Sequence, residues 1–192
     1  VAGFAPGPAA FEPPLAQGYD VILVLHSLYF FDDLAASIAD LVARLAPGGV
    51  MVVVFADETV AHTGVCYRAH VETLDAALAA AHAAACAERL ALFEGGPDAQ
   101  PGVSRLLAGA EVSAVRQETR LFGHSIADLV ALSDIAGLIG FDGVAKFDAA
   151  LTLLARDPGR LGFRIETDPA SPRYGMLSVQ QPQLVCRIAR PA

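Results

Sequence analysis

Two apolar segments separated by an amphipathic one, within residues 19–56, constrain this fold more than any other part of the chain. Residues 21–25 and 50–55 are wholly apolar and rich in β-branched side chains, which is typical of buried strands. Between them, apolar residues recur at helical spacing: Leu34, Ile38, Leu41, Val42 and Leu45. The pattern predicts two parallel strands joined by a crossover helix, in a sheet covered on both faces.

Local signals at both ends of the amphipathic segment support this interpretation. Asp32 or Asp33 can cap the start of the helix, because a short acidic side chain can accept bonds from its first free amides. Pro47, Gly48 and Gly49 are expected to end the helix and turn the chain into the second strand.

The segment YDVILVLHSLYFFDDL, followed by LVARLAPGGVMVVV, resembles the centre of class I S-adenosylmethionine-dependent methyltransferases. The resemblance implies the fourth strand of that family, its loop, the next helix and the fifth strand. The LYFFDD loop and the long helical stretch further on resemble the small-molecule branch that includes histamine N-methyltransferase. The resemblance is clear over residues 19–56 and looser from about residue 103 to the end.

That family holds its cofactor with a glycine-rich turn and an acidic residue on earlier strands, and neither precedes Tyr19. Residues 1–18 are rich in Pro, Gly and Ala and are expected to form a loop. The chain starts at Val1, so we expect a fragment, a processed product or an alternative start. The implied fold is α/β: the C-terminal half of a Rossmann-like sheet, mainly parallel with an antiparallel last strand, in one partial domain over residues 1–192.

Beyond residue 56, the pattern predicts further helices and strands. A long alanine-rich helix is expected from about residue 68 to 93 and a short one over residues 101–110. Residues 111–122 are expected to form a strand with Val112, Ala114 and Val115 buried. Residues 184–188 are the predicted last strand, with a possible partner strand over residues 176–179 and a bend at Pro182.

Two amphipathic helices, over residues 125–139 and 142–155, are predicted to interrupt the sheet. Ser125 and Asp128 form an S-x-x-D capping pattern at the first of them. Ile126, Leu129 and other apolar residues of that helix are expected to face a core. By resemblance, residues 124–156 would form a helical insertion that covers the substrate.

His26 directly follows the first apolar segment, at the edge where open α/β sheets bind ligands. By resemblance, Leu25, His26 and Ser27 are candidate contacts of S-adenosylmethionine, and His26 is the candidate catalytic residue, which would orient or deprotonate an acceptor nitrogen. The alternative is a loop histidine that only bonds to backbone.

Tyr29 and Phe30 are candidate substrate contacts, because aromatic faces attract a sulfonium or an amine. The alternative is that two of the residues in this loop simply pack beneath the helix. This packing role is expected for Phe30 or Phe31 rather than for Tyr29. Asp57 and Glu58, after the second strand, are further candidate substrate contacts that could pair with an amine, although solvated loop carboxylates are the commoner case.

The charge, the cysteine and histidine spacing and the apolar run lengths of the chain restrict the classes of partner, ligand and location that are expected. A net charge of −8 over 192 residues argues against a nucleic-acid partner and favours a small-molecule substrate. Three cysteines without CxxC spacing and histidines without HxH or HxxxH spacing predict reduced thiols and no metal site. No apolar run is long enough to cross a membrane and no signal peptide opens the chain, so a cytoplasmic protein is expected.

Two functions from different classes remain open. The first is a methyltransferase acting on a small amine- or hydroxyl-bearing acceptor, inactive in this chain alone. The alternative is a non-catalytic interaction subunit with a methyltransferase-like fold. In either case the strand over residues 21–25 would form an edge without lysine or proline, so we expect it to be covered by residues 1–18, a second copy or a partner chain.

Overall fold

The computed structural model describes residues 18–28, 31–94, 101–107, 109–132, 148, 151, 152 and 155–192. The elements in chain order are β1 (Tyr19–Leu25), α1 (Leu34–Ala43), β2 (Leu45–Ala56), α2 (His62–Leu74), α3 (Ala76–Phe93), α4 (Gly102–Leu106), β3 (Glu111–Gln117), β4 (Arg120–Gly123), α5 (Ile126–Leu132), a 3-10 helix (Pro158–Leu161), β5 (Arg164–Ile165), β6 (Leu177–Gln180) and β7 (Gln183–Ala189).

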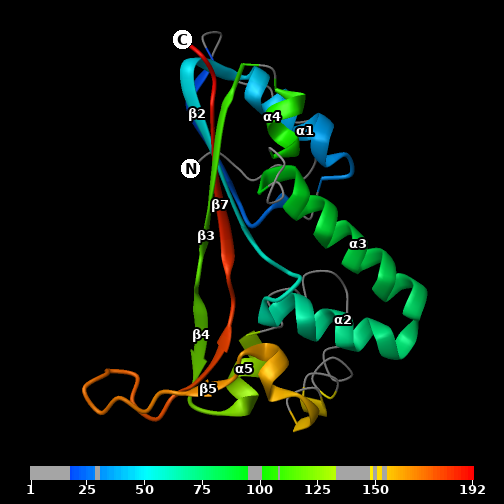
Figure 1. Ribbon diagram of the computed structural model, residues 1–192, viewed down its shortest axis with the longest axis vertical. Helices are drawn as coiled ribbons and strands as arrows, with labels where there is room; N and C mark the ends of the chain where they lie inside the picture. The colour runs from blue at the N-terminus through cyan, green and yellow to red at the C-terminus, as the bar shows by residue number, and fades with distance from the viewer. Residues whose placement is uncertain are drawn as a thin grey trace, which may run out of the picture.

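The main sheet has four strands in the order β1-β2-β7-β3. Figure 1 shows β3 and β7 side by side along the length of the molecule. β1 and β2 are parallel, with Leu25 opposite Val54, and α1 connects them as predicted. β7 runs antiparallel to both β2 and β3. The expected antiparallel last strand beside the fifth strand of the resembled family is therefore confirmed.

A second sheet, β4-β6-β5, continues from the main one. The β3/β7 pair ends at Gln117 opposite Gln183, and the same two stretches of chain pair again as β4 and β6, from Arg120 opposite Gln180. Pro182 lies at the break between β6 and β7, as the predicted bend requires. The strand expected near residues 176–179 exists as β6, but it pairs with β4 and β5 and not with the last strand.

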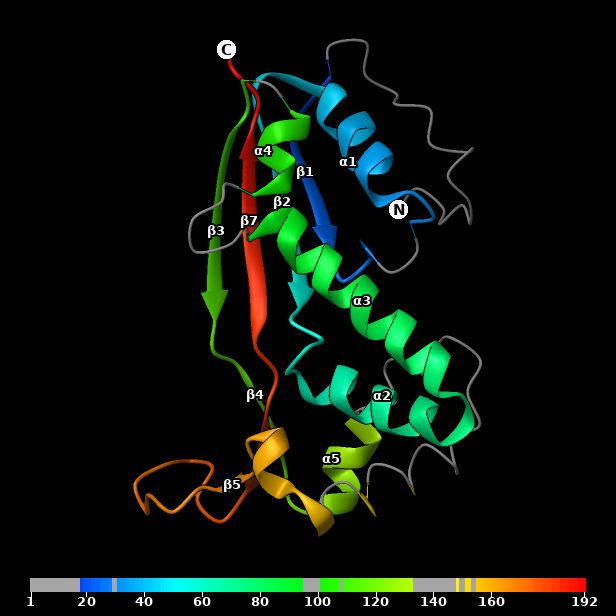
Figure 2. The ribbon, with the colours of Figure 1, turned by 45° about the vertical axis from the view of Figure 1, so that its right-hand side comes forward.

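Helices α1, α3 and α4 lie over one face of the main sheet, as Figure 2 shows. Strand residues that point toward these helices are buried, including Val24, Val53 and Cys186. A separate cluster fills the space between the second sheet, α2 and α5, and includes Cys66, Leu129 and Val179.

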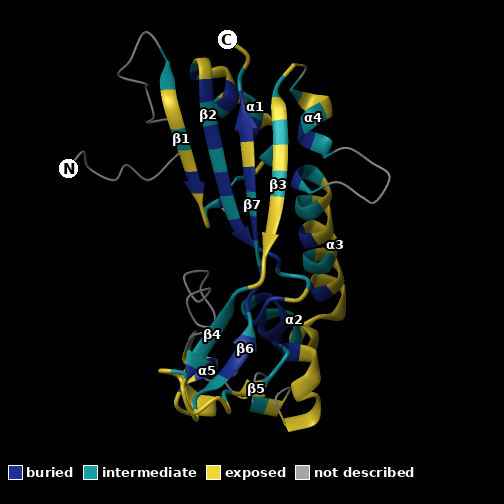
Figure 3. Ribbon diagram, turned by 60° about the vertical axis from the view of Figure 1, so that its left-hand side comes forward, coloured by how far each residue is buried: buried dark blue, intermediate teal, exposed yellow. Residues whose placement is uncertain are grey.

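The other face of the main sheet carries none of the described helices (Figure 3). On this face, the side chains of Val21, Leu23 and Leu25 are 58%, 61% and 54% exposed. The expectation of a sheet covered on two faces is therefore wrong for the described residues. All-apolar strands suggested burial on both sides, but the sequence does not encode which face the helices occupy.

The first helix ends at Ala43, before the predicted stop at Pro47. Tyr19 donates to Arg44 O at 2.9 Å, and Arg190 Nη1 donates to Ala43 O at 3.1 Å, so distant parts of the chain bind the helix end. Leu45 then begins β2 and is not a helical core residue. Of the two candidate caps, Asp33 is the one used, since its carboxylate accepts from Ala36 N.

The predicted helix over residues 68–93 is two helices with a break at Asp75. Asp75 has an extended backbone, and its carboxylate accepts from Ala77 N at 2.8 Å and Leu78 N at 3.3 Å. An aspartate between two helical stretches is a good cap, which a search for periodicity alone passes over. By length and composition, α3 would be long and apolar enough to cross a membrane. The expectation that no segment of the chain meets this criterion is therefore corrected, although one alanine-rich helix is weak evidence of a membrane span.

The predicted strand over residues 111–122 is interrupted between β3 and β4, and Val115 is 61% exposed rather than buried. The capping pattern of α5 is confirmed, because Asp128 accepts from Ser125 N and its own amide donates to Ser125 Oγ. Leu129 is buried as expected, whereas Ile126 is 42% exposed. Most of the predicted insertion over residues 124–156 lies outside the described residues, as do residues 1–17 of the loop expected over residues 1–18.

Candidate functional site

The candidate site lies at the edge of the main sheet where β1, β2 and β3 have their carboxyl ends. β1 and β2 are parallel, and β3 has the same direction because both β2 and β3 are antiparallel to β7. His26, Asp57 and Arg116 follow or end these strands and so come to one edge. Ligands of open α/β sheets bind at such an edge.

His26 lies in the left-handed region with φ of 48°, the only such non-glycine residue in the described chain. Its amide donates to Val54 O at 2.8 Å, so the backbone stays paired with β2 while the side chain is exposed. Left-handed backbone at a non-glycine residue is uncommon and is found more often at ligand sites. Ser27 is half-buried beside it, and Leu25 is exposed on the open face of the sheet.

The predictions for the aromatic residues of this loop differ in how far the structure tests them. Phe31 packs against the main core, and Leu28 is buried within it. Packing of a loop aromatic beneath the helix is thus confirmed for Phe31. Tyr29 and Phe30 lie outside the described residues, so their role as substrate contacts stays a prediction.

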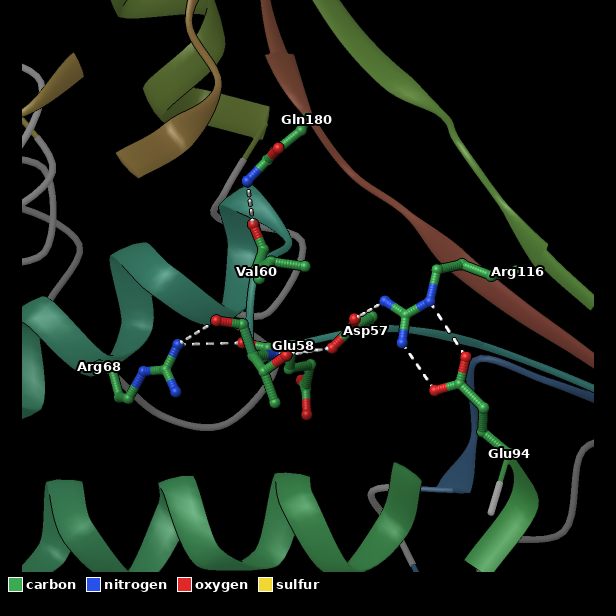
Figure 4. Close-up of polar contacts among 8 residues, drawn as sticks. Asp57, Glu58, Val60, Arg68, Glu94, Arg116 and Gln180 are labelled. Carbon is green, nitrogen blue, oxygen red and sulfur yellow. Dashed lines mark hydrogen bonds and ion pairs between the residues drawn. The ribbon is translucent and has the colours of Figure 1, made fainter. Parts of the chain in front are cut away.

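Asp57 is not a solvated loop carboxylate: its side chain is 2% exposed and forms an ion pair with Arg116 (Figure 4). Its other oxygen accepts from the amide of Thr59 at 3.1 Å. Arg116 also forms a bidentate pair with Glu94, with N–O distances of 3.1 and 2.6 Å. The bonds to Glu94 and then to Asp57 raise the pKa of Arg116, so it remains charged. This network joins the ends of β2, β3 and α3.

Glu58 is also engaged with protein groups. Its carboxylate pairs with Arg89, and the Cys86 thiol lies 3.4 Å from the same oxygen. Arg68 holds the backbone of the turn, donating to Thr59 O at 2.8 Å. Both sequence-predicted carboxylates therefore reach the expected edge, but arginines bind them.

Glu58, His82 and Cys86 form a group with ligand atoms within 4.8 Å of one another. Burial lowers the pKa of His82, which favours the neutral ring that binds metals. Burial raises the pKa of Cys86 to about 12, which disfavours the thiolate. Arg89 also forms an ion pair with the Glu58 carboxylate. In this structure the Glu58 carboxylate pairs with Arg89 and accepts from the Cys86 thiol, so a cation that bound Glu58 would have to displace Arg89.

We expect the native protein to resist thiol reagents at Cys86 and Cys186. Burial raises the pKa of both thiols from the ordinary thiol value of 9.0 to about 12, so the thiolate is about a thousandfold rarer than in the unfolded chain at pH 8. Labelling with a disulfide reagent, with and without urea, measures the reactivity of the two thiols. Fast labelling of the native protein at either position would contradict their burial.

The free energy of unfolding should also fall as pH rises above about 9, since the thiols of the unfolded chain ionise before those of the native protein.

Sequence reasoning missed Arg116, Arg89 and the Cys86–His82 pair. Arg116 follows Val112 and Ala114 on the covered face of β3, and a charge on a buried face signals a buried partner. His82 and Cys86 are four residues apart and share one face of α3, a signal that a search for histidine pairs does not use. His62 and Cys66 repeat this spacing in α2, with Sγ 3.5 Å from Nδ1.

No family model matches the sequence, and no curated protein matches it. A solved structure from Bacillus halodurans, described provisionally as a methyltransferase, matches with a TM-score of 0.51 and 12% identity, over 97% of this chain and 70% of that one. This chain has a methyltransferase-like fold. At that identity the likeness concerns the fold alone, a mixed sheet with helices.

The fit of the described residues to S-adenosylmethionine is partial. His26 presents an exposed ring at the ligand edge while its amide stays bonded to Val54 O of β2, and Ser27 is half-buried beside it. Within the described part of the chain, no strand is followed by a glycine-rich turn that could take the methionine part of the cofactor. The described residues could therefore contact one side of the cofactor and not enclose it.

Proposed function

We propose that the protein is a cytoplasmic S-adenosylmethionine-dependent methyltransferase that acts on a small amine- or hydroxyl-bearing acceptor. The observation that carries the proposal is the strand edge at which His26, with its left-handed backbone, stands beside the ion-paired turn after β2, in a methyltransferase-like fold. The acidic chain, with a net charge of −8, favours a small or cationic acceptor over a polyanion.

The cofactor would supply the electrophilic methyl group on its sulfonium. The protein then has to hold acceptor and methyl group in line, exclude water and remove a proton where the acceptor carries one. In this proposal Leu25, His26 and Ser27 contact the cofactor, and the His26 ring orients or deprotonates the acceptor. Tyr29 and Phe30 are the proposed contacts of the acceptor.

The carboxylates after β2 have different parts in the proposal. Asp57 is a positioning residue, since it is buried and bound to Arg116 and therefore fixes the turn rather than meeting an acceptor. Glu58 is half-buried, and its negative charge lies near the same edge, where it can attract an amine. Arg89 would compete for that charge, so the attraction is smaller than for a free carboxylate.

The test is calorimetric titration of S-adenosylmethionine and S-adenosylhomocysteine into protein expressed from the complete reading frame. We expect binding, weakened about fivefold or more by His26→Ala, because one side of the cofactor loses its contacts. His124→Ala is the control, since His124 is also exposed but lies in the turn before α5. Absence of binding to the unmodified protein would contradict the proposal and favour the non-catalytic interaction subunit.

A further inference from the structure

The outer edge of β1 is unpaired within the described residues, since β1 is an end strand of the main sheet. The amide of His26 points to β2, where it donates to Val54 O at 2.8 Å. Amides alternate in direction along a strand, so those of Ile22 and Val24 also face β2. The amides and carbonyls of Val21 and Leu23 therefore point outward, away from the sheet.

Apolar exposure is concentrated on the same strand. Val21, Leu23 and Leu25 are each more than half exposed, on the open face of the sheet. They continue onto β2, where Val52 lies opposite Leu23. Figure 3 shows this face without a described helix in front of it. An open edge next to an exposed apolar face recruits another strand.

The opposite edge of the sheet is different. β3 carries Glu111 at its start and Arg116 near its end, and Glu111 lies 3.9 Å from Arg187 on β7. Charges of this kind protect an edge from strand addition. The only charge on β1 is Asp20, next to Tyr19 at its start. The two edges thus have different chemistry, and only one favours pairing.

The sequence of β1, YDVILVL, is complementary to itself in antiparallel orientation. With Ile22 facing its own copy, Val21 lies opposite Leu23 of the partner subunit, and both have outward amides and carbonyls. That makes them a hydrogen-bonded pair, formed on both sides of the two-fold axis. Asp20 would face Val24 of the partner subunit, so no like charges meet.

We propose that two copies of this chain associate through β1, antiparallel about Ile22, to form one continuous sheet across the dimer. The same contact extends the apolar row, because Leu23 and Val21 of the two copies lie on one face. A second copy fits this edge because the register satisfies the outward backbone groups and brings no like charges together. The inference does not depend on methyl transfer.

Sedimentation equilibrium of the 192-residue chain is the first test, and the expected mass is twice 19.9 kDa. Leu23→Lys should raise the dimer dissociation constant about tenfold or more, because it places two like charges near the axis. Val115→Lys is the matched control: Val115 is 61% exposed on the same face, as Leu23 is, but lies on β3. We expect this control to leave the constant within about twofold. Circular dichroism verifies that both variants fold.

Amide hydrogen exchange separates the possible occupants of the edge. In the dimer, the amides of Val21 and Leu23 should be protected, and Leu23→Lys should expose them while Ile22 and Val24 stay protected by β2. A monomer in which these outward amides exchange rapidly would overturn the proposal. A monomer with protected outward amides would mean that the chain covers its own edge, and equal effects of the two lysine variants would mean association through the whole face. Either result also overturns it.

Discussion

Replacing Asp57 with alanine is expected to lower the free energy of unfolding by about 3 kcal/mol, because it breaks a pair with a buried charge. The Asp57 side chain is 2% exposed, and its loss leaves Arg116 with Glu94 alone. The amide of Thr59 loses its acceptor as well. The Arg116 side chain is 35% exposed and can gain water, which places the expected cost at the lower end of the range for buried pairs.

Urea denaturation of the variant measures this cost. Asp40→Ala is the matched control, because Asp40 pairs with Arg44 at 2.9 Å but is 61% exposed on α1. An exposed pair of this kind contributes about 0.5 kcal/mol or less. If the two variants lost the same stability, the Asp57–Arg116 pair would not be a structural tie between β2 and β3.

Gly64→Ala is expected to destabilise the protein by about 3 kcal/mol, although the same change inside a helix ordinarily stabilises it by up to about 1 kcal/mol. Gly64 lies in the first turn of α2, packed against the turn after β2. A Cβ atom at Gly64 would lie 2.6 Å from Glu58 Cα and would also meet Glu58 O. Both are backbone atoms, so the clash can be relieved only by moving α2 or the turn.

Gly159→Ala is the comparison. Its Cβ would have Asp157 Oδ1 as its nearest neighbour at 3.5 Å, which is an ordinary contact, so we expect a change within about 1 kcal/mol. Thermal unfolding of both variants gives the difference. A stable Gly64→Ala protein would mean that α2 does not press on the turn that carries Asp57 and Glu58.

Asp57→Ala and Gly64→Ala both affect the turn after β2, the first through its ion pair with Arg116 and the second through its packing against α2. The turn after β2 is fixed to β3 by Arg116, to α2 by Arg68 and to β6 by Gln180, which donates to Val60 O at 3.1 Å (Figure 4). It therefore connects the main sheet with the second sheet. Loss of that connection should also displace the edge at which we place the cofactor, so cofactor affinity should fall with stability in both variants.

The sequence by itself determined the local elements and the position of the candidate site. Apolar runs and helical spacing located β1, α1 and β2, and Ser125 with Asp128 located the start of α5, because these signals depend on neighbours within a few residues. Residues that follow strands, such as His26 and Asp57, were placed at the ligand edge because parallel strands share that edge.

Only the tertiary structure decided how those residues are used. Asp57 pairs with Arg116, 59 positions away in the chain, and the end of α1 is bound by Arg190, so neither partner can be found from local pattern. Likewise, the all-apolar run over residues 21–25 of β1 predicted burial on both faces, but Leu23 is 61% exposed. Alternation in a strand tells which residues share a face, whereas the packing of distant segments decides which face is covered.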